Sequence, residues 1–532
     1  MKLKETIIDC GVVEIHGDAA TEVTGVCFDS RKVKPGDLFI AVKGAACDGH
    51  KFIGSAIEKG AVAVIYEDLD STDCPCDNTD GTDGHGKINN DNTDTTDSTD
   101  CHGKLNNDGL DNQAGNDKGN GKKEVCFVRV KSSRHALAIA ASNFYGRPSE
   151  KLTLVGITGT NGKTTTVTLL YRMFTKLGYR CGLLSTIANY VGDRRSETVN
   201  TTSDPITINS LMAEMVEEGC GYCFMEVSSI GLEQERTAGL DFKVAIFSNL
   251  THDHLDYHKT FAEYLRCKKL FFDTLGKNAV ALINTDDRNG KVMVQNTAAK
   301  VVSYACRSHA DHNCRIIEEG VEGMLLRIDG KECWTRLIGE HNAYNLLAVY
   351  STAVELGVDS EEALVALSAM ESAPGRLEAL HGPGGITVVI DYAHTPDALE
   401  NVLKTLKDIN CKGKTICLFG CGGDRDKSKR PEMAAIAEKY ADRIIVTSDN
   451  SRSENTSDIM NDIKTGFSSE GKRKSLFIED REQAIRTAIM TAQGGDVILL
   501  AGKGHETYQI IGKEKRHFDE KEIVNEIFNE LN

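Results

Sequence analysis

The feature that most constrains this chain is a short glycine-rich loop, GTNGKTT at residues 159–165, between an apolar run and a helix-forming segment. The apolar run at 152–157 predicts a buried strand, and residues 164–177 predict a helix. In this setting, backbone N–H groups and the helix N-terminus would cradle phosphates. Lys163 would reach the β- and γ-phosphates, and the Thr164 hydroxyl would bind Mg²⁺. The predicted ATP-binding residues of the loop are Gly159, Thr160, Asn161, Gly162, Lys163, Thr164 and Thr165.

The loop departs from the strict Walker A spacing at one position, because Ile157 stands where the first glycine should be. An ordinary glycine-containing turn between a strand and a helix is the alternative interpretation, and the Gly-Lys-Thr core argues against it. The missing glycine and the absence of a guanine-binding motif argue against a P-loop kinase or a GTPase.

Alternating apolar runs and helical patterns after residue 151 predict an α/β fold with a mostly parallel central sheet. A chain of 532 residues is long enough for about three domains. We predict a small N-terminal α/β domain at 1–150, a central parallel-sheet domain at 151–375 and a Rossmann-like C-terminal domain at 376–532. Strands are expected at residues 37–43, 61–66, 152–157, 222–227, 244–248, 279–284, 386–391, 415–419, 444–448 and 497–501.

Residues 70–123 differ from the rest of the chain. They contain 12 Asp and 5 Lys, and therefore carry −7 of the net charge of −17. The segment HGKINND at 85–91 returns as HGKLNND at 102–108. So polar a stretch cannot bury enough apolar surface to offset its ordering entropy, which predicts a disordered insertion. A calcium-binding repeat is the alternative, although EF-hand ligands need a different spacing.

The composition narrows the class of protein. The net charge of −17 argues against a general nucleic-acid binder. No stretch approaches the roughly 18–20 apolar residues of a membrane span, and the N-terminus has no signal-peptide pattern. The 17 cysteines are scattered, which favours reduced thiols, and Cys220 and Cys223 are interpreted as structural. We expect a cytoplasmic protein without a membrane span.

Two polar segments follow predicted strands in the central region. MEVSS at 225–229 contains Glu226, which could hold Mg²⁺ across from the loop. HDHLDYH at 252–258 contains His254, which could contact metal or phosphate. A structural histidine is the alternative for His254, but the density of polar groups around it favours function.

These segments together resemble the Mur ligase family of ATP-dependent enzymes of peptidoglycan precursor synthesis. GTNGKTT, MEVSS, NLTHDHLDYH, GEHNAYN, APGR and DYAHTP occur in the order that the family shows. Three further segments resemble those of the family member that adds a diamino acid to UDP-N-acetylmuramoyl-L-alanyl-D-glutamate. They are DSRKVKPGD at 29–37, GCGGDRD at 420–426 and AGKGHE at 501–506. The resemblance covers nearly the whole chain apart from the insertion.

The resemblance implies roles for several further residues. The N-terminal domain would bind the UDP-substrate, the central domain ATP and the C-terminal domain the amino acid. Implied contacts to the UDP-substrate are Ser30, Asn200, Thr201, Thr202, Ser228, Gln234 and Arg236, and further ATP contacts are Asn342, Arg376 and Asp391.

Lys268 is implied to be carbamylated by CO₂ (N6-carboxylysine), which turns a lysine into an anionic ligand. The implied catalytic residues are Lys163, Lys268 and His254, and the implied Mg²⁺ shell is Thr164, Glu226, His254 and carbamylated Lys268. The reaction would proceed through an acyl phosphate of the D-glutamyl γ-carboxylate.

DNSR at 449–452 is implied to choose the amino acid. Enzymes that add meso-diaminopimelate carry DNPR there, and a guanidinium such as that of Arg452 can bind the second carboxylate of diaminopimelate bidentately. Ser451 in place of proline would loosen the loop. The implied diaminopimelate-binding residues are Arg430, Asp449, Asn450, Ser451, Arg452, Gly502 and Glu506.

Three other interpretations compete with this one. An L-lysine-adding enzyme of the same step and a folylpolyglutamate synthase-like ligase share the phosphate chemistry. A non-catalytic nucleotide-binding scaffold would bind ATP without substrate-stimulated hydrolysis. We favour a monomeric diaminopimelate-adding ligase that acts on small molecules and binds no nucleic acid.

Overall fold

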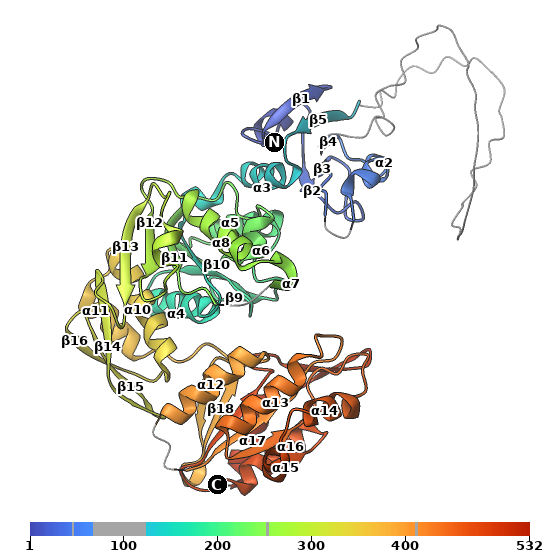
Figure 1. Ribbon diagram of the computed structural model, residues 1–532. Helices are drawn as coiled ribbons and strands as arrows, with labels where there is room; N and C mark the ends of the chain where they lie inside the picture. Colours follow the sequence, from blue (N-terminus) through green and yellow to red (C-terminus); the bar gives the residue numbers. More distant parts are fainter. Residues whose placement is uncertain (45–46, 68–123, 252–254, 410–412, 532) are drawn as a thin grey trace, which may run out of the picture. The chain divides into compact units, whose positions relative to one another are not determined.

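The computed structural model describes residues 1–44, 47–67, 124–251, 255–409 and 413–531 (Figure 1). The chain forms two compact units, Met1–Leu137 and Ala138–Asn532. The predicted α/β class is confirmed. The predicted domain limits stay a prediction, and the expectations of disorder or calcium binding at 70–123 lie outside the described residues.

The first unit is built on a five-stranded sheet of order β1-β5-β4-β3-β2. β2 to β5 run parallel and β1 pairs antiparallel with β5. β3 ends at Ile40, three residues earlier than predicted. The elements are α1 Leu3–Thr6, β1 Val12–His16, β2 Gly25–Cys27, β3 Asp37–Ile40, α2 Ile53–Glu58, β4 Ala63–Tyr66, β5 Cys126–Val130 and α3 Ser133–Phe144, which carries the boundary between the units.

The central sheet of the second unit has eleven strands in the order β16-β15-β14-β13-β12-β11-β6-β10-β7-β8-β9. Its middle part, from β14 to β7, is parallel. The elements are β6 Thr153–Thr158, α4 Lys163–Lys176, β7 Cys181–Leu184, β8 Asn189–Val191, β9 Arg194–Ser196, α5 Pro205–Glu217, β10 Tyr222–Glu226, α6 Ser229–Glu233, β11 Phe242–Phe247, α7 Leu255–His258, α8 Phe261–Asp273, β12 Val280–Asn284, α9 Gly290–Met293, β13 Lys300–Ala305, β14 His312–Gly320, β15 Gly323–Ile328, β16 Lys331–Thr335, α10 Glu340–Glu355 and α11 Ser360–Ser368.

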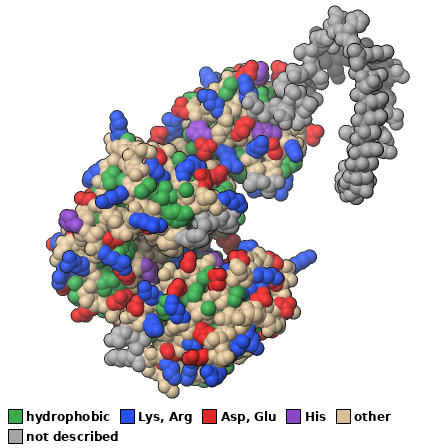
Figure 2. All heavy atoms as spheres, viewed as in Figure 1, with side chains coloured by type: hydrophobic (Ala, Val, Ile, Leu, Met, Phe, Trp, Pro, Cys, Tyr) green, Lys and Arg blue, Asp and Glu red, His purple; other side chains and the backbone are tan. Residues whose placement is uncertain are grey.

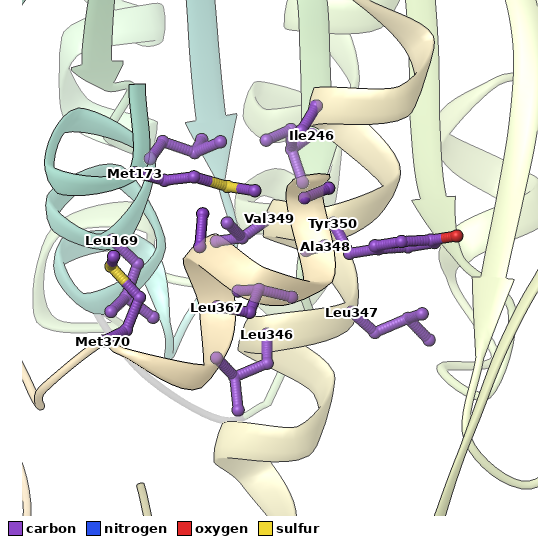
Figure 3. Packing of buried hydrophobic residues seen from close by; sticks show 14 of the residues in the cluster. Leu169, Met173, Ile246, Leu346, Leu347, Ala348, Val349, Tyr350, Leu367 and Met370 are labelled. Carbon is purple, nitrogen blue, oxygen red and sulfur yellow. The ribbon is translucent and has the colours of Figure 1, made fainter. Parts of the chain in front are cut away.

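Helices cover both faces of this sheet, which explains why its strands read as continuous apolar runs. Val155 and Ile157 of β6 join the cluster formed with α4, α10 and α11, whereas Leu154 joins the cluster with α5 and α8. In Figure 3, Met173 of α4 and Val349 of α10 meet in the first of these clusters. The alternation along β6 therefore fixes the strand between two apolar layers.

A six-stranded sheet of order β17-β18-β22-β19-β20-β21 follows in the same unit. Only β17 is antiparallel to its neighbour. The elements are β17 Glu378–His381, β18 Thr387–Asp391, α12 Pro396–Asp408, β19 Thr415–Phe419, α13 Lys429–Tyr440, β20 Arg443–Val446, α14 Thr456–Lys464, α15 Ser469–Lys474, β21 Ser475–Phe477, α16 Arg481–Thr491, β22 Val497–Ala501, β23 Tyr508–Ile511, β24 Glu514–His517 and α17 Glu520–Leu531; β23 and β24 form a separate hairpin.

The strand expected at 444–448 was predicted too long at its end. β20 stops at Val446, although the next two residues still bond to the ends of the two neighbouring strands. Thr447 N donates to Phe419 O and Ser448 N donates to Glu479 O. The two residues before the DNSR segment are therefore held at the ends of β19 and β21.

Acidic and basic side chains are interspersed over the face shown in Figure 2. Within the described part of the chain, no helix has the length and apolar character needed to cross a bilayer.

Cys223 lies in β10 as predicted and is buried, and burial raises the pKa of its thiol.

Candidate functional site

The glycine-rich loop joins β6 to α4 in a conformation that requires glycine at two positions. Gly159 has φ +152° and Gly162, at the N-cap of α4, has φ +87°. A Cβ on Gly159 would lie 1.9 Å from Ser248 Oγ, and one on Gly162 would lie 2.4 Å from Asn345 Oδ1. Backbone conformation and space therefore both exclude a side chain at these positions.

The residues after β11 hold the loop in place. Thr160 N donates to Asn249 O at 2.8 Å, and Asn161 N donates to Asn249 Oδ1 at 2.9 Å. Ser248 Oγ donates to Asn161 O at 2.7 Å. The first turn of α4 adds N–H groups that lack intrahelical acceptors, at the positive end of the helix dipole. This arrangement can bind an anion.

Two lysines share the carbonyl oxygen of Gly159. Lys163 Nζ donates to it at 2.9 Å and also to Thr160 O at 2.8 Å. Lys268 Nζ, from α8, donates to Gly159 O at 2.7 Å. Lys268 is 1% exposed and its Nζ lies 4.7 Å from the centroid of the Tyr264 ring. The loop and the lysine predicted to be modified are thus in direct contact.

Glu226 lies at the end of β10, opposite Ile157 of β6 in a parallel register. Its Oε1 accepts from Thr186 N at 2.8 Å. Its Oε2 is buried and accepts no hydrogen bond from the described residues. A free carboxylate oxygen beside a phosphate-type loop fits a bound cation. The described residues contain no cluster of three or more His, Cys, Asp or Glu side chains that could hold a metal by themselves.

His254, the remaining member of the predicted Mg²⁺ shell, lies outside the described residues. The next histidine of that segment, His258, is buried, and its Nε2 lies 2.9 Å from Ser229 Oγ.

The residues predicted to contact the muramoyl-dipeptide gather beside Glu226. Thr202 Oγ1 donates to Glu226 O at 2.9 Å and accepts from Ser228 N at 2.9 Å. Arg236 donates to Thr202 O at 2.6 Å and to Gln234 Oε1 at 2.7 Å. Thr201 joins the edge of this network, because its hydroxyl accepts from Thr186, whereas the Asn200 carbonyl accepts only a local bond from Thr198.

Ser30 belongs to the first unit. Its carbonyl oxygen accepts from Lys59 Nζ at 2.8 Å.

Asn342 on α10 is buried, and both polar atoms of its side chain are used internally. Its Nδ2 donates to Ile338 O at 2.8 Å and its Oδ1 accepts from Asn345 Nδ2 at 3.0 Å. Asn345 in turn borders Gly162. Asn342 therefore reaches the loop through Asn345.

Asp391 and Arg376 lie at the carboxyl end of β18. Asp391 accepts from Leu377 N and Ala393 N, both at 2.8 Å. Burial raises the pKa of this carboxyl, and the charge of Arg376 acts in the opposite direction. The Arg376 guanidinium carbon lies 5.1 Å from the centroid of the Tyr392 ring, and its Nε is buried without an acceptor among the described residues.

Asn450 is the hub of a second polar cluster. Its Oδ1 accepts from Ile510 N at 2.9 Å and from Lys503 Nζ at 3.2 Å, and its Nδ2 donates to Glu506 Oε2 at 2.8 Å. Lys503 is fully buried and also donates to Glu506 Oε2 at 3.2 Å. Burial alone would raise the pKa of Asp449, but the nearby charges, led by that of Lys503, leave it lowered.

Gly502 opens the segment that carries Lys503 and Glu506. Its φ is +115°, and a Cβ there would lie 2.7 Å from Asp449 Oδ2. Its N–H donates to Asp391 O at 3.0 Å. The structure therefore brings Asp449, Asn450, Gly502 and Glu506 together, and their binding of an amino acid stays a prediction.

Arg452 has a left-handed backbone, with φ +49°. Its N–H donates to Ile510 O at 3.2 Å and its carbonyl accepts from Gly512 N at 2.8 Å. Its Nη1 donates to Gly423 O at 2.8 Å. Ser451, expected to loosen this loop, is buried, and the β23–β24 hairpin anchors the next residue on both sides.

Arg430 is placed differently from the prediction. Its side chain is fully buried and pairs with Glu454 at 2.9 Å and Asp462 at 2.8 Å. It also donates to Gly422 O at 3.3 Å. These acceptors use the N–H groups of both terminal nitrogens, so Arg430 links the loops internally, and its contact with the amino acid stays a prediction.

Models of three Mur ligase regions match the chain in order. The model for the Mur ligase family, catalytic domain, matches residues 22–92. The Mur ligase middle domain matches residues 157–353, and the Mur ligase, glutamate ligase domain, matches residues 375–504. Together these matches span more than half of the sequence.

The chain belongs to the Mur ligase family.

Relatives of this Mur ligase match over its full length. A Cytophaga hutchinsonii protein named UDP-N-acetylmuramoyl-L-alanyl-D-glutamate--2,6-diaminopimelate ligase is 46% identical and covers 100% of both chains. A Phocaeicola vulgatus protein of the same name is 47% identical over 99% of each. A solved structure titled with this enzyme name has a TM-score of 0.67 at 28% identity, and covers 100% of this chain and 99% of its own.

Three residues of this Mur ligase site were missed in the sequence. Asn345 and Lys503 touch predicted residues, and each lies in a motif already singled out, GEHNAYN and AGKGHE. Arg425 is exposed in GCGGDRD. Its Cγ lies 3.9 Å, and Arg452 Nη1 3.0 Å, from the position that a Cβ would take on Gly422. Arg425 is therefore an exposed guanidinium near Arg452, whereas Arg430, four residues after the motif, is buried.

Proposed function

We propose that this chain is an ATP-dependent ligase that joins meso-2,6-diaminopimelate to the D-glutamyl γ-carboxylate of UDP-N-acetylmuramoyl-L-alanyl-D-glutamate. The observation that carries the proposal is the 46–47% identity, over nearly the full chain, to proteins that bear this activity in their names. The enzyme would act in the cytoplasm, as a monomer, in the synthesis of the peptidoglycan precursor.

Activation of the carboxylate would occur at the glycine-rich loop. A carboxylate oxygen is a poor leaving group, so transfer of the ATP γ-phosphate to it gives an acyl phosphate that an amine can attack, with release of phosphate. Lys163 would exchange its contacts with the Gly159 and Thr160 carbonyls for the phosphates. Its charge would offset the repulsion between the two reacting anions.

The residues around the loop also fit a metal ion. Mg²⁺, when bound, would supply the remaining positive charge at the phosphates. The ligands would be the Thr164 hydroxyl, the free Oε2 of Glu226, a carbamate on Lys268 and His254. The Lys268 amine would form the carbamate by attack on CO₂ with loss of a proton. Burial of Lys268 beside the loop supports this role, because the modified side chain would remain next to the phosphates.

The amino acid would bind at the cluster around Asn450. Arg452, with Arg425 beside it, would face the second carboxylate of diaminopimelate. Glu506 would accept the ammonium group, and Lys503 would hold Glu506 and Asn450 in position. Arg430 would act indirectly through Glu454.

The decisive test compares amino acids. With ATP and UDP-N-acetylmuramoyl-L-alanyl-D-glutamate present, the enzyme should release ADP far faster when meso-diaminopimelate is added than when L-lysine is added. Equal or faster turnover with lysine would assign the chain to the lysine-adding class. Turnover with a folate acceptor instead would support the folylpolyglutamate synthase-like alternative, and ATP binding without substrate-stimulated hydrolysis would support a scaffold.

A further inference from the structure

A buried ion pair lies beneath the amino-acid cluster and belongs to none of the motifs above. Arg481, the first residue of α16, and Glu520, the first residue of α17, are both fully buried at the side chain. Arg481 Nε donates to Glu520 Oε1 at 2.8 Å. Burying two charges is costly, and a pair of apolar residues would often be at least as stable. Because stability alone does not require a charged pair here, its position indicates a specific role.

The two remaining arms of the guanidinium reach two different segments of the cluster. Nη1 donates to Ser448 O at 3.0 Å and Nη2 donates to Ala501 O at 2.8 Å. Ser448 immediately precedes DNSR, and Ala501 immediately precedes the segment with Gly502 and Glu506. Each carbonyl is thus one residue from a proposed amino-acid contact.

These two carbonyls belong to strand ends that are not neighbours. β19 lies between β20 and β22 in the sheet. The chain after β20 crosses the end of β19 at Gly420, where a Cβ would lie 2.4 Å from Thr447 O. Arg481 therefore spans β19 and fixes the distance between the segment that follows β20 and the segment that follows β22. A planar guanidinium with rigidly spaced donors suits this task better than an ammonium group.

We propose that Arg481, anchored by Glu520, is a positioning residue that sets the spacing between Asn450–Arg452 and Gly502–Glu506. It touches no substrate. Instead it keeps the carboxylate-binding and ammonium-binding ends of the site at the separation that one diamino acid requires. The role rests on the proposed function, because it presumes that this cluster binds the amino acid.

Arg481→Lys tests the role, because an ammonium group keeps the charge beside Glu520 but cannot bond both carbonyls in the same geometry. We expect the KM for meso-diaminopimelate to rise about 10-fold, while the KM for ATP stays within about twofold of wild type. At saturating diaminopimelate, kcat should largely recover. An unchanged KM for diaminopimelate in a folded variant would overturn the proposal, and so would equal increases for diaminopimelate and ATP.

The matched control is Arg486→Lys. Arg486 joins the same two helices through an exposed pair with Glu530 and contacts neither segment, so its KM values should match wild type. If Arg481→Lys does not fold, Glu520→Asp decides. It shortens the anchor by one methylene and should raise the KM for diaminopimelate about threefold, and no change would refute the role. Wild-type enzyme without diaminopimelate-dependent turnover would instead contradict the proposed function itself.

Discussion

At the scale of single residues, the proposed specificity of the site depends on a backbone conformation that most residues other than glycine avoid. Arg452 holds a left-handed φ of +49°, which is uncommon for a residue other than glycine. Its backbone is bonded on both sides to the β23–β24 hairpin. The guanidinium is thereby aimed before any ligand arrives, which lowers the ordering cost of binding.

Replacing this guanidinium should weaken diaminopimelate binding specifically. Arg452→Lys keeps the charge but loses bidentate geometry, and a charge-assisted hydrogen bond contributes about 1.5–3 kcal/mol. We therefore expect the KM for meso-diaminopimelate to increase about 10-fold or more in steady-state assays. Arg327→Lys, in the exposed pair with Glu332, is the control and should behave as wild type. A wild-type KM for Arg452→Lys would remove this residue from the site.

His505 gives the stability of the molecule a pH dependence of defined sign. Burial, followed by the charge of Arg376, lowers its pKa from 6.5 to about 4. Below pH 6.5 the unfolded chain takes up a proton that the folded chain resists until about pH 4, so the folded state loses stability as pH falls through this window. The loss attributable to His505 should reach about 2 kcal/mol between pH 7 and 4.5.

His505→Gln should remove that part of the pH dependence. Urea unfolding of wild type and variant at pH 7 and pH 4.5 measures it directly. The variant should lose less stability than wild type over this interval, and parallel losses in the two proteins would contradict the assignment.

Residue types alone could not distinguish Arg425 from Arg430. Arg425 lies in GCGGDRD and Arg430 lies four residues after it, and the resemblance implied the buried one as the ligand contact. Burial and pairing with Glu454 and Asp462 distinguish Arg430 from the exposed Arg425, and these depend on how α13 and α14 pack. The loop glycines were predictable because a left-handed or crowded backbone position leaves its own sequence signal.

At the scale of elements, the connection between β4 and β5 limits how the chain can be shortened. The two strands are parallel neighbours, with Ala63 opposite Cys126 and Tyr66 opposite Arg129. Because the two strands run in the same direction, the connection from the end of β4 to the start of β5 must run back along the full length of a strand. Parallel neighbours need a crossover of roughly a dozen residues.

Replacing residues 70–123 with a Gly/Ser linker of about ten residues should leave ligase activity within about twofold of wild type. Joining residue 69 directly to 124 should instead lower the melting temperature, because the remaining residues are barely long enough to cross the sheet. Thermal unfolding and ADP release measure both outcomes. Loss of activity with the linker, in a folded protein, would show that the removed residues contribute to the reaction.

At the scale of the whole molecule, the α/β class and nearly all predicted strands follow from apolar runs of strand length, because both faces of each large sheet are covered. The ends of β3 and β20 did not follow from the apolar runs. After β3, Val42 O accepts from Gly49 N, a contact with no local signal in the sequence. The Arg481–Glu520 pair left no local signal either. It joins residues 39 positions apart to carbonyl oxygens, which carry no side-chain identity.

The two lysines that donate to the Gly159 carbonyl affect how fast a nucleotide can bind. Their contacts, with those of Asn249, fix the loop before a phosphate is present. A loop that is already ordered needs no slow rearrangement on encounter, so ATP should associate at a rate close to that of other preformed sites. Variation in ATP affinity among loop variants should therefore arise mainly from how long the nucleotide stays bound.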